Sequence, residues 1–207
     1  MSQVLLVDAG TGNLHSVHHA LLHLGCQVML TADPELVRRG GRILLPGVGA
    51  FGAFMDGLRQ RGLDLALQEA IQRGNPLLGI CVGMQALLET GEEMGERPGL
   101  GILPGRVTRF PERPGLKIPH TGWNQFWPQA PSPLFAGMPD GPYAYFNHSY
   151  YCALAHPQDA IACTGYGIQF ASVLQRENVC GIQFHPEKSQ KIGLRLLANF
   201  IGEAELP

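Results

Sequence analysis

One cysteine lies between two glycines in residues 78–85, which read Leu-Gly-Ile-Cys-Val-Gly-Met-Gln. An apolar run precedes Cys81 and a helix-like pattern follows it. Without side chains at Gly79 and Gly83, a strand and a helix can approach closely while the central residue is held outward, as in a serine nucleophile elbow. We therefore predict that Cys81 is a nucleophile in a strained turn at a strand end. A buried cysteine in a packing corner is the alternative.

Two backbone features of such a turn would assist a thiol. The N-terminus of the following helix favours thiolate over thiol. The backbone N–H of Val82 would point toward an oxygen that develops negative charge on the attacked carbon.

A second reactive motif, Gly-Ile-Gln-Phe-His-Pro-Glu, occupies residues 181–187 at the end of an apolar strand. Pro186 fixes the turn, so the carboxylate of Glu187 can return to one imidazole nitrogen of His185 while the other nitrogen faces the thiol. A cysteine that contacts a histidine, which in turn contacts an acid, is an arrangement that performs nucleophilic acyl transfer. A histidine at a strand end can also be purely structural, but the cysteine turn in the same chain favours catalysis.

The pattern of elements predicts how these motifs are held. Strands are expected at 4–8, 27–31, 43–45 and 77–80, and helices at 13–24 and 58–73. This alternation predicts an α/β fold with a doubly wound, mostly parallel central sheet and helices on both faces. The C-terminal half predicts short, partly antiparallel strands at 106–110, 143–146, 150–154, 168–174 and 179–184, loops at 91–105 and 111–119, and a last helix at 189–201.

Composition limits the class of protein. The chain has 207 residues, of which 45% are hydrophobic and 15% charged, and a formal net charge of -2. These values predict one domain over residues 1–207, with no binding of nucleic acid or membrane. With no signal peptide and no long apolar run, the chain is expected in the cytoplasm. Five widely spaced cysteines predict reduced thiols rather than a disulfide framework or a zinc cluster.

The two motifs together resemble those of the class I, triad-type glutamine amidotransferases. Further segments resemble the branch formed by the glutaminase subunits of imidazole glycerol phosphate synthase: DAGTGN (8–13), PGVGAFG (46–52), PHTGWN (119–124), YFNHSYY (145–151) and HPEKSQ (185–190). The resemblance spans essentially the whole chain. It departs from the pattern at Val82, Thr121 and Asn147, where leucine, methionine and valine are usual, and Asn147 leaves the local substrate contacts open.

This resemblance implies hydrolysis of L-glutamine to glutamate and ammonia, with Cys81 as nucleophile, His185 as general base and acid, and Glu187 orienting the imidazole. An N–H of the loop at Val48 and Gly49 is implied to join that of Val82 in an oxyanion hole. Gln85, one helical turn past Cys81, is placed to hydrogen-bond glutamine. Further substrate contacts are expected from Gly49, His148 and Ser149. Gln85 could instead be a solvated helix residue. His148 and Ser149 could instead form a turn next to an aromatic strand.

The resemblance also implies a partner, a (β/α)8-barrel cyclase in a heterodimer that receives the ammonia for histidine biosynthesis. Asn13, Trp123 and Lys188 are the interface candidates, although each could be a cap, a core aromatic or a solvated charge. No cofactor is expected, because the chain has no Walker loop and residues 10–15 depart from the dinucleotide fingerprint. His15, His19 and His23 share metal-ligand spacing, but their position opposite the apolar stripe of the helix favours solvent exposure.

Alternative functions remain open from the sequence. One is a free-standing cysteine hydrolase or peptidase on a related fold, which would turn over without a partner and accept other substrates. The others are a glutaminase subunit of a different amidotransferase, and a flavodoxin-like binding module whose cysteine is structural.

Overall fold

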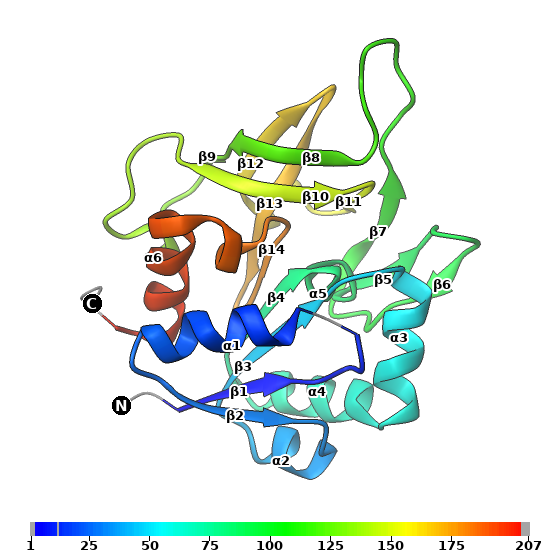
Figure 1. The fold of residues 1–207 in the computed structure, drawn as a ribbon. Helices are drawn as coiled ribbons and strands as arrows, with labels where there is room; N and C mark the ends of the chain where they lie inside the picture. The colour runs from blue at the N-terminus through cyan, green and yellow to red at the C-terminus, as the bar shows by residue number, and fades with distance from the viewer. Residues whose placement is uncertain (1–2, 12, 204–207) are drawn as a thin grey trace.

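Figure 1 shows the protein as a computed structural model that describes residues 3–11 and 13–203. Gly12 of the motif at 8–13 and both ends of the predicted domain lie outside the described residues. In the described part of the chain, no helix combines the length and the apolar character that crossing a membrane requires.

The largest sheet carries the site. It has eight strands in the order β2-β1-β3-β4-β14-β13-β12-β9. The first five in this order run parallel, and the last three are antiparallel to their neighbours. The strands are β1 (Gln3–Val7), β2 (Gln27–Thr31), β3 (Arg42–Gly47), β4 (Leu77–Cys81), β14 (Val179–Ile182), β13 (Ile168–Arg176), β12 (Ala160–Tyr166) and β9 (Trp127–Pro128). The predicted doubly wound, mostly parallel sheet is confirmed.

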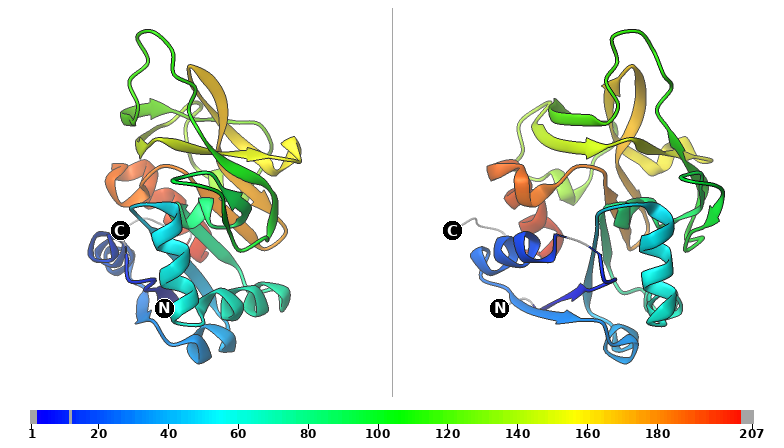
Figure 2. Two further views of the ribbon diagram at one scale, coloured as in Figure 1. Left: turned by 90° about the vertical axis from the view of Figure 1, so that its right-hand side faces the viewer. Right: turned by 45° about the vertical axis from the view of Figure 1, so that its right-hand side comes forward.

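Helices cover both faces of the parallel strands. Figure 2 shows α1 (Leu14–His23) and α6 (Gln190–Ile201) on one side, and α3 (Phe51–Gln60) and α4 (Leu63–Gln72) on the other. Since both faces are covered, a central strand such as β4 is buried at every position. A short helix, α2 (Pro34–Arg39), begins where the side chain of Asp33 accepts a hydrogen bond from the backbone N–H of Glu35 at 2.9 Å.

Two smaller sheets lie beside the antiparallel end of the large sheet (Figure 1). One pairs β10 (Tyr143–His148) with β8 (His120–Gln125), and the other has the order β11-β7-β5-β6. Its strands are β11 (Tyr150–Leu154), β7 (Leu103–Arg109), β5 (Leu88–Gly91) and β6 (Arg97–Pro98). The antiparallel character predicted for the C-terminal half is confirmed.

Several element boundaries differ from the prediction. Residues 58–73 are mostly helical, as expected, but Gly62 adopts φ +66° and separates α3 from α4. The loop expected at 91–105 contains β6 and the start of β7. The sequence pattern also missed α2, β5, β8, β9 and β12, most of which are short or paired at an edge, where periodicity is weakest.

Candidate active site

Cys81 lies at the carboxyl end of β4 with φ +54° and ψ −109°. This left-handed conformation is one that residues with a side chain rarely adopt, and it costs about 1–3 kcal/mol. The next residue begins a helix, as expected, and this helix, α5 (Val82–Gln85), has a single turn. The strained turn expected at Cys81 is present.

The two flanking glycines allow this turn to pack. A Cβ at Gly83 would lie 1.8 Å from the backbone oxygen of Leu45 on β3, and a Cβ at Gly79 would lie 2.6 Å from the backbone oxygen of Gly83. Real Cβ atoms essentially never come that close to another heavy atom. The spacing Gly-x-Cys-x-Gly is therefore a packing requirement of the turn that presents the thiol.

The register of the parallel strands brings the second motif to the thiol. β14 pairs with β4 so that Ile182 lies opposite Ile80, one residue before Cys81. His185 follows three residues later and is 4% exposed. The backbone N–H of His185 donates to the carbonyl of Tyr145 at 2.9 Å. The hydroxyl of Ser189 donates to the carbonyl of His185 at 2.6 Å. The backbone of His185 is thus held by hydrogen bonds at both its N–H and its carbonyl.

The partners of the His185 imidazole favour its protonated form. Its Nδ1 lies 2.9 Å from Oε1 of Glu187, whose side chain is 1% exposed, and its ring also hydrogen-bonds Cys81. Burial disfavours the charged imidazole, but the hydrogen bonds and negative charges of Cys81 and Glu187 outweigh burial and raise the pKa of His185 to about 10. The ring is therefore a cation at neutral pH, and a cation beside a cysteine favours the thiolate form of that cysteine.

For the other described cysteines burial, rather than a histidine cation, is the main influence on the thiol. Cys26, Cys152, Cys163 and Cys180 are all free. Burial raises the pKa of each of these thiols, in the case of Cys180 to about 12. A buried thiol without a neighbouring cation is a poor nucleophile, so the surroundings single out Cys81.

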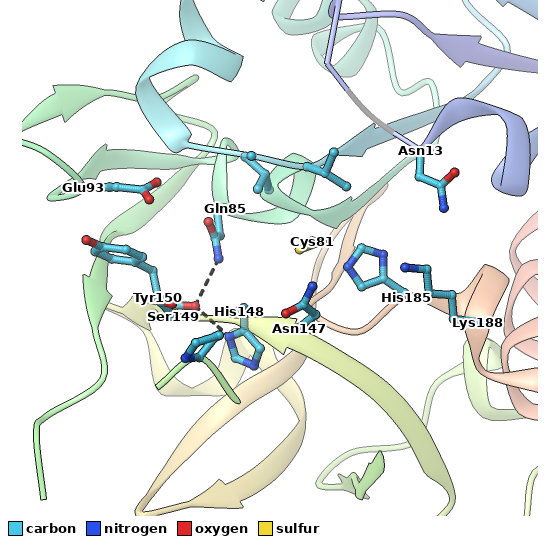
Figure 3. A pocket seen from close by; sticks show the side chains of 14 residues that line it. Asn13, Cys81, Gln85, Glu93, Asn147, His148, Ser149, Tyr150, His185 and Lys188 are labelled. Carbon is cyan, nitrogen blue, oxygen red and sulfur yellow. Dashed lines mark hydrogen bonds between the residues drawn. The ribbon is translucent and has the colours of Figure 1, made fainter. Parts of the chain in front are cut away.

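A cavity of about 470 Å³ opens at the thiol (Figure 3). It brings together most of the residues predicted from the sequence to bind substrate or a partner: Asn13, Val48, Gly49, Cys81, Val82, Gln85, His148, Ser149, His185 and Lys188. Glu187 lies behind His185 rather than on the cavity wall. Trp123 is on β8, outside this cavity, and is 47% exposed.

The loop after β3 lies directly beside the thiol. Gly47, the last residue of β3, pairs with Cys81 in the parallel register, so Val48 and Gly49 continue over the cavity. Gly49 has φ +95°, a conformation that a larger residue would rarely adopt. The loop leads into α3, whose first backbone N–H, that of Phe51, donates to Oε2 of Glu93 at 2.7 Å.

Gln85 is placed differently from the prediction. It is buried, and its Nε2 donates to the carbonyl of Tyr150 at 3.1 Å and to Oε1 of Gln183 at 3.2 Å. Nε2 of Gln183 in turn lies 3.8 Å from Sγ of Cys81. The two amide protons of Gln85 are already used, so only its oxygen can meet a ligand, and the reading of Gln85 as a solvated helix residue is wrong.

His148 is also more constrained than predicted. It is buried, and both ring nitrogens have protein partners: Nδ1 lies 2.8 Å from the carbonyl of Tyr150, and Nε2 lies 3.0 Å from Nδ1 of His120. His148 nevertheless lines the cavity beside Ser149, and the expected contact with substrate stays a prediction. Ser149, the next residue, lines the cavity as predicted for a substrate contact.

Acid should destabilise the protein through this histidine pair. Burial lowers the pKa of His120 to about 4, and burial together with nearby His120 and His185 lowers the pKa of His148 to about 3, against 6.5 for ordinary histidine. Below 6.5 the unfolded chain binds protons that the folded chain excludes, so stability present above that pH is lost as the pH falls toward 4. At about 1.4 kcal/mol per pKa unit, the free energy of unfolding should drop by roughly 3–5 kcal/mol between about pH 7 and about pH 4.5.

Urea unfolding followed by circular dichroism at several pH values measures this loss. The control is the double variant His120→Phe/His148→Phe, which should lose most of the dependence between those pH values. An equally steep dependence in the double variant would contradict the assignment to these histidines.

The sequence analysis missed some residues at the cavity. Glu93, Pro119 and Tyr150 line it, and Gln183 and His120 contact residues that do. Asn147 also lines the cavity, and its Oδ1 accepts from the hydroxyl of Thr121, its cross-strand neighbour, at 3.0 Å. Two of the three departures from the family pattern are thus one hydrogen-bonded pair. No periodicity pointed to Glu93, which lies in a charged loop.

The interface candidates are not all in one place. Asn13 and Lys188 line the cavity near Cys81 and His185 (Figure 3). Nζ of Lys188 lies 5.6 Å from the ring centroid of Tyr145, and Trp123 packs edge-on against the same ring at 6.1 Å. Tyr145 therefore connects the exposed tryptophan to the lysine at the cavity. On α1, His15, His19 and His23 are exposed, as predicted.

Comparison with known proteins agrees with the geometry. Residues 5–204 match the family model described as glutamine amidotransferase class-I. The chain is 50% identical over 200 residues to the imidazole glycerol phosphate synthase subunit HisH of Symbiobacterium thermophilum, covering 97% of this chain and 93% of that protein. It is 48% identical to the subunit of the same name from Salinibacter ruber, covering 94% and 92%.

A solved structure shares the fold. PurLQS from Thermotoga maritima superposes with a TM-score of 0.75 at 16% sequence identity, covering 99% of this chain and 100% of that chain. The match of the family model over nearly the whole chain, together with the identity to the HisH subunits, shows that this protein belongs to the class I glutamine amidotransferase family.

Proposed function

We propose that this protein is the glutaminase subunit of an imidazole glycerol phosphate synthase, in which it hydrolyses L-glutamine to glutamate and ammonia through a thioester at Cys81. The observation that carries the proposal is the meeting of three groups from two strand ends: a strained cysteine, a buried imidazole that bonds it, and a carboxylate 2.9 Å from that imidazole. The two HisH relatives, each a subunit of imidazole glycerol phosphate synthase by name, support the assignment to this branch.

The residues support an ordered reaction. The Cys81 thiolate attacks the side-chain amide carbon of glutamine, and the carbonyl π electrons move to oxygen. His185 donates its proton to the departing nitrogen, the C–N bond breaks, and ammonia leaves a thioester. His185 then takes a proton from water, whose oxygen attacks the thioester; glutamate departs and the thiolate and imidazolium are restored. Glu187 holds Nδ1 of His185, so that Nε2 faces these proton transfers.

Negative charge on the substrate oxygen needs hydrogen-bond donors in each tetrahedral intermediate. The backbone N–H of Val82 and an N–H of the loop at Val48 and Gly49 are the donors we assign, since both segments line the cavity beside the thiol. One such donor contributes about 3 kcal/mol to transition-state stabilisation. The carboxylate of Glu93 connects this loop to the far end of the cavity through its bond to α3.

Glu93 also suits the α-ammonium group of glutamine. It is the one acidic side chain among the residues that line the cavity, and its Oε1 has no part in the bond to Phe51. We expect Glu93→Gln, which keeps an oxygen for the helix N–H, to raise KM for glutamine by roughly tenfold to a hundredfold with a smaller change in kcat. Steady-state ammonia release measures both constants. Glu89→Gln, on β5 outside the cavity, is the control, and an unchanged KM for Glu93→Gln would contradict this role.

Ammonia must reach an acceptor on another protein. Free ammonia is protonated in neutral water and loses its nucleophilic lone pair, so transfer needs a closed path between two subunits. The proposed partner is a (β/α)8-barrel cyclase in the cytoplasm, and Asn13, Trp123 and Lys188 are the proposed contacts. Lys188 and Asn13 lie at the cavity, which supports an interface that covers the opening of the active site.

The deciding experiment measures ammonia from glutamine with the chain alone, with the cyclase subunit, and with the cyclase and its ligand. We expect strong stimulation by the ligand-bound cyclase and covalent labelling of Cys81 by a glutamine-mimicking electrophile. Full turnover without a partner, with other amides or peptides as substrates, would indicate a free-standing hydrolase. No labelling and no ammonia under any condition would indicate a binding protein and overturn the proposal.

A further inference from the structure

Two buried histidines bond each other behind the active-site cavity. His120 on β8 and His148 on β10 are cross-strand neighbours, and Nδ1 of His120 lies 3.0 Å from Nε2 of His148. The outer nitrogens are also used: Nδ1 of His148 lies 2.8 Å from the carbonyl oxygen of Tyr150, and Nε2 of His120 lies 3.2 Å from Nδ2 of Asn124. The four residues form one continuous chain of hydrogen bonds.

The groups at the two ends determine where every proton in this chain lies. The carbonyl of Tyr150 can only accept, so Nδ1 of His148 carries a hydrogen and, in the neutral ring, Nε2 accepts. Nδ1 of His120 must then donate, and its Nε2 accepts from the amide of Asn124. That amide is oriented independently, because its oxygen accepts from the following backbone N–H at 2.8 Å. Both histidines are therefore neutral, each as the Nδ1–H tautomer.

Aromatic packing keeps both rings from turning. His120 is stacked between Tyr166, at a centroid distance of 3.9 Å, and Phe146, at 4.7 Å. The ring of His148 packs against Phe110 and Phe170, each at a centroid distance of 5.2 Å. A rigid apolar surrounding strengthens a hydrogen bond and makes an unpaired polar atom costly. The direction of the N–H of His148 is consequently well defined.

This N–H acts on the wall of the active site. The carbonyl of Tyr150 accepts from Nδ1 of His148 and also from Nε2 of Gln85, as the dashed lines in Figure 3 show. From Gln85 the contacts continue to Gln183 and then to Sγ of Cys81. The peptide that joins Tyr150 to Tyr151 and the side-chain amide of Gln85 therefore take their positions from His148.

We propose, on the basis of the glutaminase function above, that His148 is a positioning residue for the substrate and that His120 supplies the hydrogen bond to its other ring nitrogen. His148 touches no reacting atom. It holds the Tyr150 carbonyl and, through it, Gln85, so that the wall formed by Ser149, Tyr150 and Gln85 matches bound glutamine. Losing this support weakens the binding of glutamine and of the transition state alike, so it raises KM and leaves kcat nearly unchanged.

The test compares four variants in the complex with the ligand-bound cyclase. His148→Phe removes the N–H to Tyr150 and should raise KM for glutamine about fivefold to tenfold, as expected for one lost hydrogen bond, with kcat within about twofold. His148→Asn offers an amide N–H near the position of Nδ1 and should recover most of this loss. His120→Phe keeps the N–H of His148 and should change KM by less than about threefold.

The double variant His120→Phe/His148→Phe separates positioning from stability. His148→Phe leaves the N–H of His120 buried without a partner, whereas the double variant removes both polar groups and should unfold at a higher urea concentration than His148→Phe. Its KM should nevertheless stay raised, because the Tyr150 carbonyl still lacks the N–H. Alkylation of Cys81 by iodoacetamide, which has no glutamine moiety, should be unchanged in all variants.

Two results would overturn the positioning role. One is an unchanged KM in His148→Phe. The other is a double variant in which both the KM and the stability toward urea return to the parent values. These differ from failure of the glutaminase function, in which the parent protein itself releases no ammonia with the ligand-bound cyclase. In that case the positioning role falls with the function on which it rests.

Discussion

Replacing Cys81 by alanine is expected to lower the rate of ammonia release from glutamine by about 10⁴-fold or more, because no thioester can form without the sulfur. The loss should appear in kcat, measured with saturating glutamine and the ligand-bound cyclase. Cys152→Ala is the matched control, since Cys152 is another buried free cysteine and burial raises its pKa. This control should keep most of the activity and remain labelled at Cys81.

The same experiment ranks the other two members of the proposed triad. His185→Ala should be about as inactive as Cys81→Ala, because the proton needed by the leaving nitrogen has no other donor. Glu187→Gln should retain at least about tenfold more activity than His185→Ala, because an amide oxygen can still accept from Nδ1 and orientation is only partly lost. Similar activity in the parent and in all three variants would rule the triad out.

The second large effect is expected for Gly83→Ala, which should lower the free energy of unfolding by about 3 kcal/mol or more. The new methyl group would lie 1.8 Å from the backbone oxygen of Leu45, and a strand carbonyl at the centre of the sheet cannot move aside as a flexible side chain could. β3 or the turn at Cys81 must shift. Since Gly47 at the end of β3 pairs with Cys81, the shift also displaces the loop over the cavity.

Urea unfolding and labelling of Cys81 by a glutamine-mimicking electrophile measure the two consequences of Gly83→Ala. Gly165→Ala is the control, because a Cβ at Gly165 would meet no atom within 4 Å and its φ is not positive. It should cost little stability and leave labelling unchanged. A Gly83→Ala protein with the stability and labelling rate of the parent would show that close packing of the turn against β3 is not required.

The strain at Cys81 explains why a close fit is needed around it. A residue with a side chain at φ +54° persists only when neighbouring contacts hold it there. Gly79 and Gly83 provide these contacts by letting α5 rest on β3 and β4. The same tight packing aims the thiol at His185, whose backbone is held by hydrogen bonds at its N–H and its carbonyl. Strain and reactivity therefore depend on the same contacts.

The sequence alone determined the parts of the site that depend on local backbone geometry. Gly-x-Cys-x-Gly predicts a strained turn wherever it ends a buried strand, and His-Pro-Glu predicts a carboxylate that returns to the preceding imidazole, because the atoms involved lie within a few residues. The alternation of apolar strands and helices predicted the parallel sheet for the same reason, since both periodicities are local. These inferences sufficed to name the candidate nucleophile and the candidate base.

Only the tertiary structure decided the contacts that depend on strand register. The β4–β14 pairing brings His185 to Cys81 across more than a hundred residues, and the β8–β10 pairing makes His148 a partner of His120. The side-chain amide of Gln85 likewise donates its hydrogen bonds to Tyr150 and Gln183, two residues distant in the sequence. No local pattern encodes these partners, because a shift of register by one residue would exchange the faces of a strand while leaving its sequence the same.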